Sequence, residues 1–164
     1  SFLRNLIINK AHGICDNNSN FMGSCMVGVL SGSVYENSSI QNIIIRNSEI
    51  KGTSTDFHQN GKWLAIGGAI GKLASPNNNY KFENIAADVN IYLKSLTFSN
   101  PEKVYVGGFI GECHNNVKTC VNNVYAQGSI DTNSSCENVG SVFGIYFSNV
   151  SQKTLYYVNS AAKN

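Results

Sequence analysis

The 164-residue sequence carries little charge and no long apolar run. Lys and Arg together number 12 and Asp and Glu 10, which leaves a net charge of +2, and the basic residues form no cluster. Proteins that hold nucleic acid through its phosphates need such clusters, so the composition argues against that class. No stretch approaches the roughly 18 consecutive apolar residues of a membrane-spanning helix, so we expect no membrane span in this segment.

Proline is scarce, with two residues, and helical periodicity is missing. The apolar runs are short, rich in Ile, Val and Tyr, and interrupted by Gly or Asn every few residues. Such runs are typical of short β-strands, so we expect an all-β protein. The chain opens directly with Ser1-Phe2-Leu3 and has neither an initiator Met nor a signal-like start. We therefore expect it to be a fragment of a longer chain.

A glycine element of the form G-x-x-x-G recurs four times. Its first glycines are separated by 39, 40 and 33 residues. The four pairs are Gly28 and Gly32, Gly67 and Gly71, Gly107 and Gly111, and Gly140 and Gly144. Recurrence at such a period indicates a repeat architecture in which each unit stacks on the unit before it.

An asparagine that precedes an apolar run forms a second repeated element. It occurs at Asn5, Asn42, Asn84 and Asn123. Together the two elements divide the chain into a partial unit at 1–24 and units at 25–62, 63–103, 104–136 and 137–164. We predict a single repeat domain folded as a parallel β-solenoid (β-helix) with about four units of 33–40 residues. Winding in a coil supplies the crossovers that parallel strands require.

Each glycine element is expected to be one strand with two faces. One face carries aliphatic residues such as Val106 and Ile110 and should point inward. The other face places an apolar residue between two glycines, as in Gly107, Phe109 and Gly111. Because glycine lacks a side chain, a second layer could approach the backbone there and contact Phe109. We expect this layer to come from the same chain, with a neighbouring protein as the alternative.

The asparagine column has two candidate roles. An Asn side chain at a bend can hydrogen-bond the local backbone. Asn side chains in register on successive windings can also bond to one another as a ladder. Asn is abundant, with 24 residues, so composition alone is a further explanation. Four occurrences in register before an apolar run favour the ladder.

Residues 105–131 resemble the GLUG motif, which runs G-G-hydrophobic-hydrophobic-G, a variable loop, and then N-x-Y-A-x-G-x-hydrophobic. The unit from Gly107 to Ile130 carries nearly all of this pattern, as GGFIG and NVYAQGSI. The unit that begins at Gly67 has Ala-Ala in place of Tyr-Ala and lacks the later glycine, and the unit at Gly28 is weaker still. The resemblance implies a secreted or surface-attached, adhesin-like protein in which the repeat serves as a stalk or spacer.

The cysteines and glycosylation sequons bear on the compartment. There are five cysteines, and two pairs of them bracket Asn-rich loops: Cys15 with Cys25, and Cys113 with Cys120. In an oxidising compartment these pairs could form disulfides and leave Cys136 over, whereas the alternative is that they are small buried hydrophobic residues. Four sequons are compatible with a secreted glycoprotein but are no more frequent than chance predicts. They stand at Asn17, Asn37, Asn133 and Asn149.

We expect no catalytic, cofactor or metal site. Carbohydrate-cleaving enzymes place an acid and a base close together, whereas the carboxylates here are scattered. The best column is Arg46, Asp88 and Gln127, each four residues after its unit's Asn. In neighbouring windings Arg46 and Asp88 would form a surface ion pair worth at most about 1 kcal/mol, which suits cohesion better than catalysis. The spacing of Cys113, His114 and Cys120 is a poor match to zinc ligands.

Two functional hypotheses follow. The first is a non-enzymatic structural or adhesive module of a larger extracellular or surface-attached protein, acting as stalk, spacer or assembly unit. Its partners would be neighbouring repeats or copies of itself stacked at the solenoid ends, where strand edges lie open, together with other surface proteins or glycans. The alternative is a carbohydrate-binding or carbohydrate-active β-helix with aromatic residues that stack on sugars. Its candidates are Tyr35, Trp63, Tyr80, Tyr92, Tyr105, Tyr125 and Tyr146.

Overall fold

The computed structural model describes residues 1–15, 25–52, 64–74, 79–93, 103–113, 118–132, 138–140, 143–146, 150–157 and 161–163. Every element that lies wholly within these residues is a β-strand, and every strand pairing among them is parallel. The all-β prediction is confirmed. No helix in this part of the chain is long and apolar enough to cross a membrane.

The strands form three parallel sheets. Sheet A has the order β1-β5-β8-β11-β15, with β2 beside β5 and with β12 between β8 and β16. Its strands are β1 (Phe2–Asn9), β2 (His12–Cys15), β5 (Ser38–Gly52), β8 (Asn79–Tyr92), β11 (Lys118–Gln127), β12 (Ser129–Asp131), β15 (Val150–Tyr157) and β16 (Ala161–Lys163). Sheet B contains β3 (Cys25–Gly28), β6 (Leu64–Gly67), β9 (Val104–Gly107) and β13 (Asn138–Gly140). Sheet C contains β4 (Ser31–Val34), β7 (Ile70–Leu73), β10 (Ile110–Cys113) and β14 (Phe143–Tyr146).

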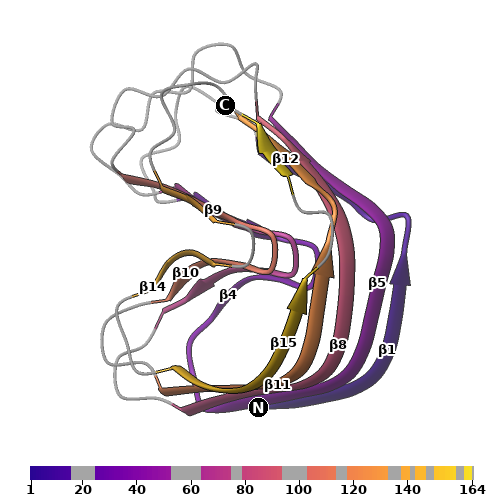
Figure 1. Ribbon diagram of the computed structural model, residues 1–164, viewed down its shortest axis with the longest axis vertical. Coiled ribbons are helices and arrows are strands. Elements are labelled where there is room, and N and C mark those ends of the chain that lie inside the picture. Colours follow the sequence, from indigo (N-terminus) through magenta and orange to yellow (C-terminus); the bar gives the residue numbers. More distant parts are fainter. Residues whose placement is uncertain are drawn as a thin grey trace.

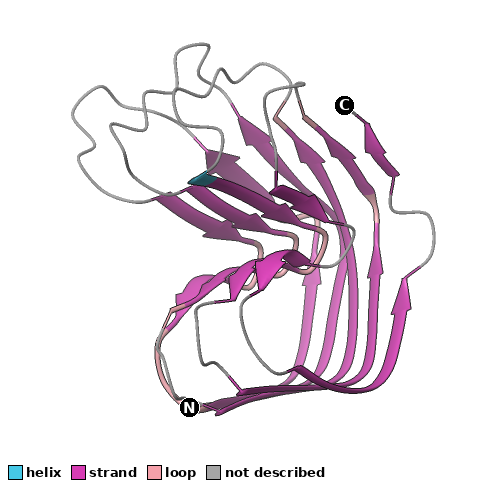
Figure 2. Ribbon diagram, turned by 60° about the vertical axis from the view of Figure 1, so that its left-hand side comes forward, coloured by secondary structure: helices cyan, strands magenta, loops and turns pink. Residues whose placement is uncertain are grey.

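The chain passes through sheets A, B and C in that order and then returns to sheet A one strand further along. We call each passage a winding: β1–β4 form winding 1, β5–β7 winding 2, β8–β10 winding 3 and β11–β14 winding 4. Figure 1 shows sheet A as a curved outer layer, with sheets B and C inside its curve. Figure 2 shows the strands of successive windings side by side.

Equivalent residues of the repeat lie in register across the windings. The first glycines of the four glycine elements pair in sequence order along sheet B: Gly28, Gly67, Gly107 and Gly140. In sheet A, Ile91 of β8 pairs with Ile50 of β5 on one side and with Ile130 of β12 on the other. The period seen in the sequence therefore corresponds to strand register in space.

The glycine element is not the single two-faced strand expected from the sequence. In winding 2, β6 ends at Gly67, the chain bends at Gly68 and Ala69, and β7 begins at Ile70. Winding 3 repeats this arrangement between β9 and β10. The element thus joins sheet B to sheet C, and its two glycines belong to different sheets. Alternation of faces along one strand could not anticipate this, because the chain changes direction within the element.

The glycines allow the backbones of sheets B and C to touch. A Cβ atom added at Gly111 would lie 2.6 Å from the Ile66 nitrogen, and one at Gly71 would lie 2.7 Å from the Val27 nitrogen. The second layer expected at the glycines therefore comes from the same chain. Phe109 lies in the bend, and its ring packs edge-to-face against Phe82 of sheet A, with 5.7 Å between ring centroids.

Apolar side chains from the three sheets form one continuous core. In sheet A the inward positions of neighbouring windings form columns, such as Ile43, Ile85 and Val124, each at most 2% exposed. Burial of one such side chain contributes about 1.5–3 kcal/mol. The core therefore runs along the stack, and each winding buries part of the next.

Candidate functional site

Four strands of sheet A, β1, β5, β8 and β11, each contain an asparagine in the left-handed backbone conformation at an equivalent position. Asn5, Asn42, Asn84 and Asn123 have φ values of 59°, 54°, 54° and 53°. This conformation is unfavourable for most side chains, and Asn is among the residues that tolerate it best. The repeated asparagine is therefore required first by the backbone, at the point where the strand changes direction.

The four asparagine side chains are joined by hydrogen bonds from winding to winding. Asn42 Nδ2 donates to Asn5 Oδ1 at 3.0 Å, and Asn84 Nδ2 donates to Asn42 Oδ1 at 3.0 Å. Asn123 Nδ2 donates to Asn84 Oδ1 at 2.9 Å. The predicted ladder is present, and it has a direction: every NH₂ group donates toward winding 1. All four side chains are solvent-exposed.

A second, shorter ladder was missed by the sequence reasoning. Asn47 Nδ2 donates to Asn9 Oδ1 at 3.1 Å, and Asn47 also has a positive φ, of 52°. In winding 1 the corresponding positive φ, of 57°, belongs to Lys10. The sequence does contain the signal: Asn9 follows Asn5 by four residues, and Asn47 follows Asn42 by five. The difference of one residue between the two spacings hid the repeat.

A further polar contact joins windings 2, 3 and 4 around Glu83. Gln41 Nε2 donates to Glu83 Oε2 at 2.7 Å, Asn122 Nδ2 donates to Oε1 at 3.4 Å, and Lys81 Nζ lies 2.8 Å from Oε2. The hydrogen bond from Lys81 is the main cause that holds the pKa of Glu83 below its usual value. This carboxylate therefore links neighbouring strands.

The buried charges of sheet C were also missed. Lys72 Nζ lies 2.7 Å from Glu112 Oε1, and each side chain is 7% exposed. The two residues are direct register partners in β7 and β10, and Ser33 of β4 stands at the same position. The other carboxylate oxygen, Glu112 Oε2, is buried and has no hydrogen-bond partner among the described residues. A charged residue recurring inside an otherwise apolar strand was the available signal.

The structure brings together one of the two predicted cysteine pairs. Cys15 ends β2 and Cys25 begins β3, and their thiols form a hydrogen bond that lowers the pKa of Cys25 against the opposing effect of burial. They are thiols here, without a disulfide. Cys113 is a buried thiol that forms no disulfide, and burial raises its pKa to about 12, with a contribution from Glu112. The Cys120 side chain and Cys136 lie outside the described residues.

The predicted ion pair between Arg46 and Asp88 is absent from the described part of the chain, where the ion pairs join other residues. The pairing of β5 with β8 shifts register between Ile45 and Ser48, so that two residues stand opposite Asp88. Gln127 pairs with Asp88 in the sheet, and its side chain accepts a hydrogen bond from Tyr125 Oη. The expected column is therefore interrupted by the extra residue of β5.

The remaining candidate residues are dispersed. Tyr80 and Tyr105 are buried, at 1% and 8% exposure, whereas Tyr35 and Tyr92 are exposed. Among the sequons, Asn37 is exposed and its Oδ1 accepts a hydrogen bond from the Asn79 backbone. Three sequons (Asn17, Asn133 and Asn149), with Trp63 and the Tyr146 side chain, lie outside the described residues. Within those residues, no group of three or more His, Cys, Asp or Glu could hold a metal ion.

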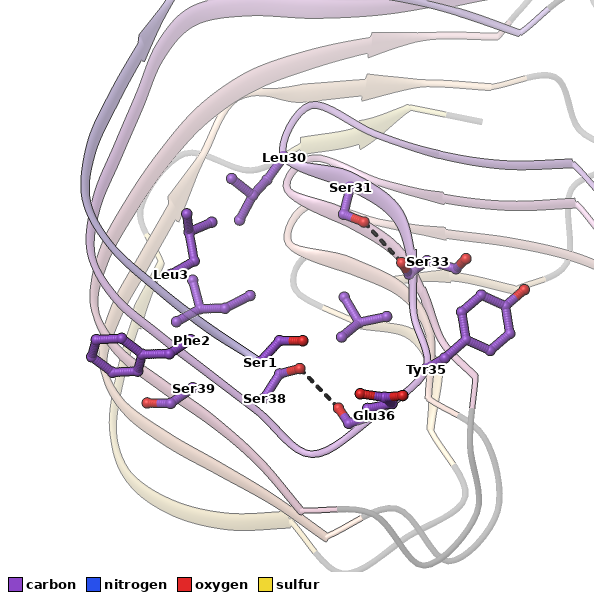
Figure 3. Close-up of a pocket in the computed structure, with 12 residues that line it drawn as sticks. Ser1, Phe2, Leu3, Leu30, Ser31, Ser33, Tyr35, Glu36, Ser38 and Ser39 are labelled. Carbon is purple, nitrogen blue, oxygen red and sulfur yellow. Dashed lines mark hydrogen bonds between the residues drawn. The ribbon is translucent and has the colours of Figure 1, made fainter.

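Winding 1 presents an open end of the core. A cavity of about 400 Å³ lies between sheet A and β4, and its lining includes Leu3, Leu30, Val34 and Ile40. Figure 3 shows Leu3 and Leu30 pointing into this space, while Tyr35 points away from it. Its polar lining consists of Ser residues and Glu36, so among the described residues it holds no cluster of charged groups that could perform acid–base chemistry.

Comparison of the chain with models of known families, with characterised proteins and with solved structures gives no significant match.

Proposed function

We propose that the chain is a parallel β-solenoid and that it serves as a non-enzymatic structural repeat module of a larger extracellular or surface-attached protein. The observation that carries this proposal is the continuity of the stack. Sheet A pairs continuously from β1 through β5, β8 and β11 to β15, and an Asn with positive φ recurs in β1, β5, β8 and β11. An assembly of this kind can lengthen by adding windings.

The contacts between windings suit a stalk or spacer. Strands in a sheet are about 4.8 Å apart, so each added winding would extend the module by about that distance. The asparagine ladder adds a side-chain hydrogen bond to the backbone bonds at each step. The module's length would therefore be set by the number of repeats.

The placement of the carboxylates supports a structural role. Glu112 binds Lys72, Glu83 binds Lys81, and Glu49 binds Lys51 and His12. Each of these acids is neutralised by a cation of its own or a neighbouring strand. The sugar-binding alternative is less well supported, because Tyr80 and Tyr105 are buried and cannot stack on a sugar ring.

The proposal is tested on the full-length protein in intact cells. Brief protease treatment of the cell surface should release peptides from the 1–164 segment, while peptides of a cytoplasmic marker stay absent. The purified segment should hydrolyse none of a panel of polysaccharides. Release of its peptides only after cell lysis would overturn the surface location, and hydrolysis would overturn the non-enzymatic role.

A further inference from the structure

We propose that the open end of winding 1 is a docking site for one further winding of the same chemistry. The occupant would add a strand parallel to β1 with an Asn opposite Asn5 and apolar residues opposite Leu3, Leu6 and Ile8. This inference rests on the proposed solenoid and names what the module binds at this end.

The first observation is incomplete burial of the core column in winding 1. Leu3 is 38% exposed, whereas Ile40, its register partner in winding 2, is 5% exposed. Leu6 and Ile8 are only partly buried, and their partners in β5 are at most 1% exposed. A covering winding would complete the burial that windings 2 and 3 already have.

The second observation is the cavity at this end. Its apolar lining comes from Leu3 and Ile40 of sheet A, from Leu30 in the bend before β4, and from Val34 at the end of β4 (Figure 3). Val34 is partly buried, whereas its register partner Leu73 in winding 2 is fully buried. The cavity is therefore the interior of the stack, left open where no winding covers it.

The third observation is the direction of the asparagine ladder. Each Asn donates from Nδ2 to the Oδ1 atom of the preceding winding, so the next acceptor in the series would lie beneath Asn5. In the described residues, Asn5 Oδ1 accepts from Asn42, and no side chain accepts from Asn5 Nδ2. An Asn carbonyl at that place would continue the ladder, and its positive φ would give the incoming strand the same bend.

A second copy of this chain is a poorer occupant. A head-to-tail copy would offer the β15 end, where Thr154 is the register partner of Asn122 and Leu155 that of Val124, so no Asn stands at the ladder position. A copy related by two-fold symmetry would pair β1 with β1 in antiparallel orientation. All strand pairings described in this chain are parallel, and antiparallel pairing would not continue the ladder.

The test adds a winding to the whole chain. A copy of residues 38–79 is placed before Ser1. This segment makes one full turn, because Ser38 and Tyr80 are register partners in neighbouring windings. Its Asn42 copy would then lie opposite Asn5. Hydrogen exchange is measured on the β1 amides, with the β5 and β8 amides as internal reference. We expect the β1 amides that exchange freely in the 1–164 chain to become as protected as those of β5.

The matched control is the same extension with Asn42→Gly in the added copy, which keeps the positive φ but removes the amide. Loss of one net hydrogen bond should weaken docking by a factor of about 2–10. In a second measurement, a synthetic peptide of residues 38–52 or its Asn42→Gly version is added to the 1–164 chain, and exchange of the β1 amides is compared. This measurement does not depend on folding of the extension.

Protection of β1 in either format, weaker with Gly, supports the inference. If β1 stays unprotected in both formats while β5 and β8 are protected, the docking site is wrong but the solenoid stands. If the unextended chain itself protects β1 in a concentration-dependent dimer, the occupant is a second copy and the inference is overturned. Unprotected β5 and β8 amides would instead refute the solenoid on which the proposed function rests.

Discussion

Lys72 of winding 2 and Glu112 of winding 3 form a buried ion pair, with 2.7 Å between Nζ and Oε1. Both side chains are 7% exposed, so water screens the attraction between the two charges only weakly. Removing two charges from water costs several kcal/mol per ion, and the attraction between them offsets that cost only when both are present. The pair therefore makes correct stacking of windings 2 and 3 a condition for burying either charge.

The first prediction concerns this pair. Lys72→Met and Glu112→Leu should each lower the free energy of unfolding by about 3–5 kcal/mol, because each removes the opposite charge from beside a buried ion. The double variant Lys72→Met/Glu112→Leu should lose much less than the sum and stay close to the wild type. Urea denaturation of all four proteins gives the coupling energy from a double-mutant cycle.

The exposed pair of Lys81 and Glu83 is the control for this cycle. Its side chains are 50% and 26% exposed, so Lys81→Met should cost less than about 1 kcal/mol. Additive effects at Lys72 and Glu112, equal to those at the exposed pair, would contradict the buried arrangement.

The second prediction separates the two roles of the ladder asparagines. Asn84→Gly keeps the positive φ of 54° and removes two side-chain hydrogen bonds, to Asn42 and from Asn123. It should cost about 1 kcal/mol of unfolding free energy, because each of the two exposed bonds contributes at the low end of the usual range, about 0.5 kcal/mol. Asn84→Leu removes the same bonds and also strains the backbone, which adds about 1–2 kcal/mol. Thermal denaturation should therefore rank wild type above Gly and Gly above Leu.

Asn123→Gly is the matched control for the ladder, since among the described residues Asn123 makes one ladder hydrogen bond whereas Asn84 makes two. Its cost should be about half that of Asn84→Gly. A Leu variant as stable as the Gly variant would show that the backbone at position 84 does not require a positive φ.

Much of the fold was predictable because Gly and Asn recur at positions where the backbone tolerates few other residue types. Gly67, Gly71 and Gly111 are glycines because contacts between the sheets leave no room for a side chain, and Asn recurs because it tolerates the left-handed conformation. These constraints act at single positions, so they survive in the sequence as a period. Parallel stacking then follows from the period.

The path of the chain within each winding was not predictable from the same pattern. Alternation along a strand cannot reveal that Gly68 and Ala69 form a bend between two sheets, because buried residues on both sides of the bend are equally apolar. The Lys72–Glu112 pair was missed for a related reason: the partners are 40 residues apart, and only the strand register brings them together. The ion pair of Arg46 with Asp88 was predicted but is not formed among the residues that the structure describes. The prediction assumed equal spacing after each Asn, whereas β5 has one extra residue there, which shifts its register against β8.

The third prediction concerns the thiols. Thiolates are the nucleophiles in alkylation, so the lowered pKa of Cys25 gives it more thiolate at any pH than an ordinary cysteine has. The pKa of Cys113, raised to about 12, leaves about one thiolate in 10⁴ at pH 8. In the folded protein, iodoacetamide at pH 8 should therefore label Cys25 well before Cys113, as read by peptide mass spectrometry.

The contact between Cys15 and Cys25 also predicts their chemistry with an oxidant. Oxidised glutathione should convert the two thiols to a disulfide with loss of two hydrogen atoms, while the glutathione disulfide is reduced to two thiols. Cys15→Ala should abolish this product and slow the alkylation of Cys25, whereas Cys113→Ala should change neither. Equal labelling of Cys25 and Cys113 in the native protein would contradict the placement of both residues.

The fourth prediction compares two glycines that differ in what surrounds them. Gly111→Ala would place a Cβ atom 2.6 Å from the Ile66 nitrogen and 2.7 Å from the Gly71 oxygen, both of them backbone atoms that cannot move independently. We expect it to cost about 3 kcal/mol or more, because sheets B and C would have to separate. Gly13→Ala meets the side-chain atoms Ile50 Cγ1 at 3.0 Å and Val27 Cγ1 at 3.3 Å, which can shift, so it should cost about 1 kcal/mol.

The two substitutions remove the same conformational freedom from the unfolded chain, so their difference reports on the folded state alone. Urea denaturation of both variants under the same conditions measures that difference. A gap of about 2 kcal/mol would agree with direct backbone contact between sheets B and C. If Gly111→Ala were no more destabilising than Gly13→Ala, the two sheets could not lie as close as the glycines imply, and the repeated G-x-x-x-G element would need another explanation.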